Sequence, residues 1–108
     1  MTPMTHDEVM AMLDSMGISY AYDHFAEGES PDPPFICFLY PRSDNFSADN
    51  IVYASANELD IEVYTDYKDP DLEEKIEEIL TKNELYYEKS EVWIESEKLY
   101  EVLYTVMV

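Results

Sequence analysis

The sequence predicts a single α+β domain spanning residues 1–108, in which two helices pack on one mostly antiparallel sheet in the order α-β-β-β-α-β-β. Three observations support this fold class: two helical apolar stripes, several strand-like apolar segments, and a hydrophobic content of 46% that includes ten tyrosines. The net charge is −19, from 25 acidic and 6 basic residues. Disordered acidic chains are poor in aromatic and β-branched residues, so this composition indicates a folded acidic protein.

The first helix is expected over residues 6–16. Thr5 and Glu8 have the three-residue spacing of a capping box, in which the two residues satisfy backbone N–H groups at the start of a helix. Gly17 supplies the C-terminal stop, because glycine readily adopts the left-handed conformation that follows many helices. The apolar stripe of this helix consists of Val9, Met12, Leu13 and Met16.

The second helix is expected to begin at Pro70, with Asp69 as its N-cap, and to end at Asn83. Proline is favoured in the first turn, because its missing N–H would have no partner there in any case. The opposite face is mostly acidic and is expected to be solvated. The apolar stripe consists of Leu72, Ile76, Ile79 and Leu80.

Five segments are expected to form strands. The segment 35–40 is almost continuously apolar, which is typical of a strand that is covered on both faces. The segment 99–108 is apolar on both alternations, so it is either central in the sheet or covered by another subunit. The expected strands are 19–22, 35–40, 51–65 with a kink or bulge after its first residues, 91–95 and 99–108.

The polar segment 41–50 is expected to be a loop that joins two strands and is longer than a tight turn requires. Phe46 is its only large apolar residue, and it either folds back onto the core or fills a pocket in a partner. We favour the partner, to which Arg42 could also offer a bidentate contact with a carboxylate. Arg42, Asp44, Asn45 and Phe46 are therefore candidate interface residues.

Further candidate interface residues lie in the strands. Glu58, Asp60 and Glu62 alternate with aliphatic residues, so they face solvent or a partner while Leu59, Ile61 and Val63 face the core. Trp93 stands between two glutamates and is expected on the outward face of its strand. Because tryptophan is enriched in protein interfaces, Trp93 is either an interface residue or incidentally exposed.

The residues favour no enzymatic function, and no cofactor or metal site is expected. With only two glycines the chain has no phosphate-binding glycine loop. Cys37, the only cysteine, lies in an apolar segment and is expected to be a buried hydrophobe without a disulfide partner. His24 is interpreted as a turn residue rather than a metal ligand. Among 25 carboxylates, proximity by itself is weak evidence for an acid and base pair.

The charge balance also restricts the partners. The six basic residues are scattered among carboxylates, so direct binding of nucleic acid is not expected. No apolar run approaches the roughly 20 residues that span a bilayer, and a membrane partner is not expected. The N-terminus has no basic region followed by an apolar stretch, so the sequence predicts no secretory signal and expression in the cytoplasm.

Five segments together resemble small prophage proteins of the tail-terminator or head–tail joining family of long-tailed phages. The resemblance covers nearly the whole chain and implies an α+β subunit without enzymatic residues. It further implies a hexameric ring at the head-proximal end of the tail tube, with the chain itself and the tail-tube and connector proteins as partners. The implied location is the host cytoplasm during assembly and then the virion. The segments are 21–28, 33–36, 39–46, 58–65 and 90–97.

By position, the resemblance implies that the loop 42–50 reaches a neighbouring tail or connector ring. A second hypothesis belongs to a different class, an acidic inhibitor that mimics DNA. Glu58, Asp60 and Glu62 recur every two residues, about 6.6 Å along a strand, and such a row of charge could enter a basic nucleic-acid groove. A simply solvated strand face is the third possibility.

Overall fold

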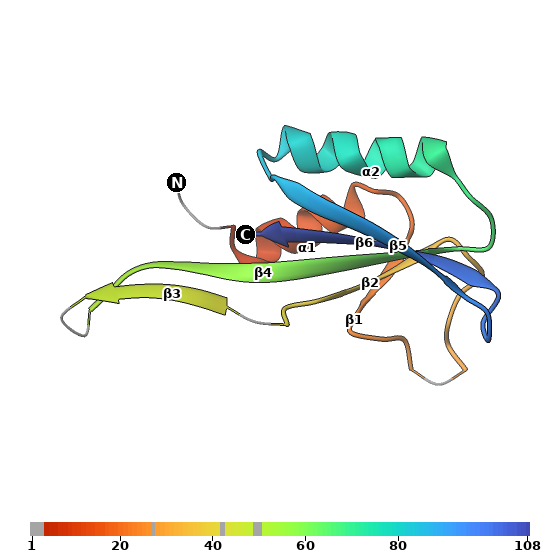
Figure 1. Ribbon diagram of the computed structural model, residues 1–108, viewed down its shortest axis with the longest axis horizontal. Helices are drawn as coiled ribbons and strands as arrows, with labels where there is room; N and C mark the ends of the chain where they lie inside the picture. Colours follow the sequence, from red (N-terminus) through yellow and green to blue (C-terminus); the bar gives the residue numbers. More distant parts are fainter. Residues whose placement is uncertain (1–3, 27, 42, 49–50) are drawn as a thin grey trace.

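The computed structural model describes residues 4–26, 28–41, 43–48 and 51–108, with only the backbone described for 43–48 and 51–57. The predicted α+β class is confirmed, because two helices pack on one mostly antiparallel sheet (Figure 1). In chain order, the elements in this part of the chain are α1 (His6–Asp14), β1 (Ser19–Tyr22), β2 (Phe35–Leu39), β3 (Ser43–Ala48), β4 (Ile51–Thr65), α2 (Pro70–Lys82), β5 (Tyr87–Ile94) and β6 (Leu99–Met107).

The strands follow the order β1-β2-β4-β6-β5, and β3 pairs with β4 beside this path. Only the pairing of β1 with β2 is parallel among the described strands, and the other pairings are antiparallel. Strand β6 lies between β4 and β5, which confirms the central position as the explanation for its apolar character. Strand β2 is also covered on both faces as predicted, since Phe35, Ile36, Cys37 and Phe38 are all buried.

The helix boundaries follow the local signals in the sequence. The Thr5 hydroxyl accepts a hydrogen bond from the Glu8 N–H, and the Glu8 carboxylate accepts one from the Thr5 N–H, both at 3.1 Å. Helix α1 ends at Asp14, two residues before the predicted boundary. Helix α2 has the predicted start, and the Asp69 carboxylate accepts a hydrogen bond from the Leu72 N–H at 3.1 Å.

The core lies between the helices and one face of the sheet. Both helices cover this face, which we call the helix face (Figure 1). The predicted inward residues of β4, Leu59, Ile61 and Val63, are fully buried there and meet Tyr104 and Val102 of β6 across the ladder. The main contributors from the helices are Val9, Met12, Leu13, Ile76 and Leu80.

The prediction of a loop over residues 41–50 is wrong for Ser43–Ala48, which form β3 and pair with the first half of β4. Strand β4 continues beyond the part that pairs with β2 and β6, and its backbone groups there are satisfied by β3 instead. This pairing overrides the low strand propensity of a polar segment. The register shifts between Phe46 and Ser47, as expected for the predicted bulge in the facing strand.

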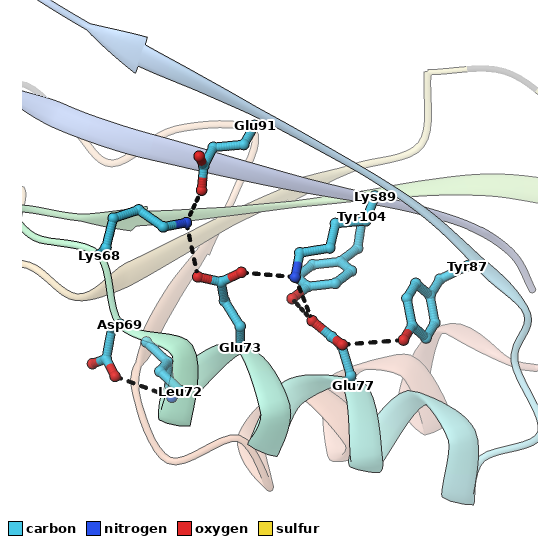
Figure 2. Close-up of polar contacts among 9 residues, drawn as sticks. All are labelled: Lys68, Asp69, Leu72, Glu73, Glu77, Tyr87, Lys89, Glu91 and Tyr104. Atoms are coloured by element: carbon cyan, nitrogen blue, oxygen red, sulfur yellow. Dashed lines mark hydrogen bonds and ion pairs between the residues drawn. The ribbon is translucent and has the colours of Figure 1, made fainter.

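Two lysines join helix α2 to the edge of the sheet (Figure 2). The Nζ atom of Lys89 lies 2.7 Å from a carboxylate oxygen of Glu73 and 2.8 Å from one of Glu77. Lys68, which precedes the helix, lies 3.1 Å from the other Glu73 oxygen and also contacts Glu91 of β5. Burial would lower the pKa of Lys89, but its hydrogen bonds to the two glutamates outweigh this effect and raise it.

Glu77 is also the acceptor for two tyrosines of the sheet (Figure 2). The hydroxyl of Tyr104, a fully buried residue, donates to Glu77 Oε2 at 2.7 Å, and the hydroxyl of Tyr87 donates to Oε1 at 3.2 Å. Burial raises the pKa of Glu77, but the hydrogen bonds from Lys89 and the tyrosines lower it by more. Glu77 therefore satisfies the one polar atom of the largest core side chain.

Replacing Glu77 by alanine should destabilise the protein. The buried Tyr104 hydroxyl would lose its acceptor, which costs about 1–3 kcal/mol and lowers the Tm by roughly 5–15 °C. Thermal unfolding followed by circular dichroism measures this loss. The matched control is Glu78→Ala, one position along the same helix on an exposed residue, which should change the Tm by about 2 °C or less. Equal losses in the two variants would contradict a special role for Glu77.

Candidate interaction surface

The second face of the sheet carries neither of the two helices, and we call it the open face (Figure 1). The ladder registers assign its residues, because every second side chain along a strand points to the same face. Rows of paired residues cross the sheet from β2 through β4 and β6 to β5. The three complete rows are Phe35, Tyr64, Glu101 and Val92; Cys37, Glu62, Leu103 and Ser90; and Leu39, Asp60, Thr105 and Glu88.

Aromatic residues cover one corner of the open face. The ring of Phe25, which follows β1, meets Phe35 edge to face at a centroid distance of 5.5 Å. Phe35 in turn stacks on Tyr64 at 5.1 Å. Beneath them Cys37 is buried, and burial together with nearby carboxylates raises the pKa of its thiol to about 11. The predicted buried and unreactive cysteine is therefore confirmed in its burial, and its thiol remains protonated at neutral pH.

Two glutamates stand near the middle of the open face. Glu62 of β4 and Glu101 of β6 are both half-buried and occupy adjacent rows. Burial raises the pKa of Glu62, and the charge of Glu101 raises it further, while a hydrogen bond from the Tyr64 hydroxyl at 3.2 Å lowers it. Among the described residues, neither glutamate has an ion-pair partner, because the lysine ion pairs are made to Glu73, Glu77, Glu91 and Glu95.

Apolar side chains also lie on the open face. Leu103 lies beside Glu62 in the ladder and is half-buried. Val92 lies beside Glu101 and is 52% exposed, and Met107 is 43% exposed. The open face therefore combines half-buried carboxylates with exposed apolar side chains, and it is a candidate interaction surface.

The predicted alternation of β4 is confirmed, since Glu58, Asp60 and Glu62 occupy the face opposite the core residues. All three are half-buried rather than fully exposed. Asp60 accepts a hydrogen bond from the Thr105 hydroxyl at 3.1 Å. The row of carboxylates is therefore engaged with its sheet neighbours at Asp60 and Glu62.

Trp93 is exposed as predicted, at 41%, but it does not share the open face. It pairs with Tyr100 of β6. Since side chains alternate between the two faces along β6, Tyr100 and Trp93 both lie on the helix face, and their ring centroids are 4.7 Å apart. The outward position was expected because Trp93 is flanked by glutamates. One of them, Glu91, contacts Lys68 on the helix face instead. The indole N–H donates to Glu95 at 2.6 Å.

Strand β3 and the first half of β4 form an arm that extends away from the two helices (Figure 1). This arm accounts for the elongated shape of the chain, which measures 50 × 29 × 23 Å. Asp44, Asn45 and Phe46 lie in β3, where they pair with Ala56, Ser55 and Ala54. Arg42 lies outside the described residues.

The predicted interface residues thus fall into three places: the arm, the open face and, for Trp93, the helix face. Sequence reasoning missed Glu101, Val92 and Met107, which complete the open face. Glu101 did leave a signal, because it is the only charged residue between Leu99 and Val108. A single carboxylate in an otherwise apolar central strand has to reach solvent or a partner.

No family model matches the chain, and no curated protein matches it either. Within the described residues there is no group of histidine, cysteine or carboxylate side chains that could hold a metal ion. The helices of this part of the chain are too short and polar to cross a membrane.

Replacing Glu62 by glutamine should stabilise the protein at neutral pH. The folded-state pKa of Glu62 is raised, so its charge opposes folding above that pKa, and the penalty disappears as the pH falls through it. Glutamine keeps an acceptor for Tyr64, and we expect a Tm gain of about 1–3 °C at pH 7 that shrinks toward about pH 4. The exposed Glu88→Gln, on the same face, serves as control for the loss of one charge. A gain that did not exceed the control, or did not depend on pH, would contradict the desolvation of Glu62.

Proposed function

We propose that this protein is a non-enzymatic phage assembly subunit, a tail terminator or head–tail joining protein that forms a ring at the head-proximal end of the tail tube. The observation that carries the proposal is the β3–β4 arm, which extends beyond the helices and the core. An arm of this kind can contact a neighbouring subunit or ring. The resemblance of the sequence segments to tail-terminator and joining proteins supports the same function.

The distribution of charge is compatible with an assembly role. Each copy carries a net charge of −19, so copies in a ring repel one another unless salt, geometry or basic partners reduce the repulsion. The ion pairs of Lys68 and Lys89 are made within the chain, between α2 and the sheet. These two lysines are therefore engaged within the chain, and we expect basic partners to supply positive charge to the assembly. An acidic channel would also avoid trapping DNA that passes through it.

The double change Arg42→Ser with Phe46→Ser tests the arm. The backbone of Phe46 lies in β3, and both side chains are expected to contact a partner rather than the core, so the Tm should change by about 2 °C or less. The joining of tails to heads in a complementation assay should be lost, because the arm would no longer fit its neighbour. Tyr86→Ser is the control, since Tyr86 is 89% exposed and lies far along the chain, before β5.

The control variant should join tails to heads at the normal level. A large loss of thermal stability in the arm variant, with joining intact in the protein that remains folded, would show that the arm only supports the fold. Normal joining by a fully stable arm variant would contradict the role of the arm in assembly.

A second candidate function is an acidic inhibitor that mimics DNA. It is favoured by one observation, the position of Glu58, Asp60 and Glu62 along one face of β4. Against it, these side chains are half-buried and stand beside apolar residues such as Leu103 and Met107, whereas a mimic of the DNA backbone needs projecting charges.

Competition with DNA separates the two functions. A mimic should displace DNA from a basic DNA-binding protein of the host, and replacing Glu58, Asp60 and Glu62 by glutamine should weaken this competition about tenfold or more. We expect an assembly subunit to leave DNA binding unchanged in a fluorescence polarisation assay with host DNA-binding proteins. Strong competition that depends on the three carboxylates would favour the mimic instead.

A further inference from the structure

We infer that the open face binds a cationic polypeptide segment in which lysine or arginine side chains stand beside aliphatic ones. The proposal concerns a surface separate from the β3–β4 arm, and it rests on the proposed function only in taking the chain to act by binding other proteins. Its contact points are Glu62, Glu101, Leu103, Val92 and Met107.

The first argument is the apolar surface that the open face leaves uncovered. Phe25 packs over Phe35 at one corner, and the described helices both lie on the opposite face. Val92 and Met107 remain 52% and 43% exposed. Val92 lies one row from the half-buried Leu103 on the neighbouring strand, and Met107 lies two rows from it along β6, beyond Thr105. Covering such side chains contributes about 25 cal/mol for each Å² of apolar surface removed from water.

The second argument is the state of the central carboxylates. Glu62 and Glu101 lie in adjacent rows and raise each other's electrostatic energy, and among the described residues no cation pairs with either. The nearby protein surface already removes part of their hydration. A cation placed between them would meet two half-buried carboxylates at once, which favours a charge-assisted contact.

The charge of the face selects the class of partner. A second copy of this chain would bring the same carboxylates against each other, and nucleic acid would bring phosphates, so both are disfavoured. A bare metal ion is also disfavoured, because no group of ligands within the described residues could hold one. The apolar neighbours Leu103 and Val92 require aliphatic contacts next to the cations. A basic polypeptide supplies both.

Binding of short peptides to the full chain tests the inference. The probe is a peptide of about ten residues in which pairs of lysines alternate with pairs of leucines. In an extended conformation each side of this peptide presents both lysine and leucine, and the peptide is long enough to cross the strands of the face. A lysine–serine peptide of the same length and charge measures the contribution of the apolar contacts. Affinity is measured by fluorescence polarisation at low salt, and the contacted amides are mapped by NMR.

Two matched double variants separate the open face from the general acidity of the chain. Glu62→Gln with Glu101→Gln should weaken binding of the lysine–leucine peptide about tenfold or more, as expected for two charge-assisted contacts. Glu74→Gln with Glu78→Gln removes the same charge from exposed positions of α2 and should weaken it by less than about threefold. The lysine–serine peptide should bind more weakly to the unmodified protein than the lysine–leucine peptide.

The amide shifts should concentrate on β4 and β6 around Glu62 and Leu103. Equal weakening in the two double variants, shifts centred on the helices, or no binding of the lysine–leucine peptide at low salt would overturn the inference. None of these outcomes involves the joining of tails to heads, so the proposed function stands or falls separately with the arm variant.

Discussion

The alternation of side chains along the two central strands is the constraint on which the rest of the structure depends. In β4 the residues Leu59, Ile61 and Val63 are fully buried under the helices, and the residues between them point the other way. Ile61 faces Tyr104 of β6, so one register places the core residues of both strands on the same face. A shift by one residue would put the glutamates of β4 under the helices, and the desolvation of those charges makes such a register inaccessible. The helix face and the open face follow from this single register.

The same register determines where Lys68 and Lys89 form their ion pairs. Tyr104 points into the core and needs an acceptor for its hydroxyl, which Glu77 of α2 provides. The half-buried Glu77 and its neighbour Glu73 then attract Lys89, and Lys68 joins them from the segment before α2 (Figure 2). The lysine pairs that hold α2 against the sheet are therefore concentrated on the helix side. The open face keeps carboxylates without this compensation at Glu62 and Glu101.

Most of the fold could be predicted because its signals are local. The capping box at Thr5, the N-cap at Asp69 and the alternation of β4 each depend on residues a few positions apart. Strand β3 could not be predicted in this way, because its polar residues become a strand only through pairing with β4. The face of Trp93 was also beyond local reasoning. Its flanking Glu91 is held by Lys68 from a distant segment, so an acidic neighbour did not mean an outward face.

The candidate interface was predicted in part, and the missing part changes its character. The sequence showed the carboxylates of β4 as a simple charged row, but the register adds Glu101 and exposed apolar residues from β6 and β5. A protein selected only for stability would place a neutral side chain at Glu62, since burial and the neighbouring charge of Glu101 raise the pKa of Glu62 and its charged form opposes folding. Natural sequences keep destabilising side chains mainly at functional sites. The like charges of Glu62 and Glu101 lie near Leu103 on the open face. A bound cation from a partner would explain why both charges are kept there.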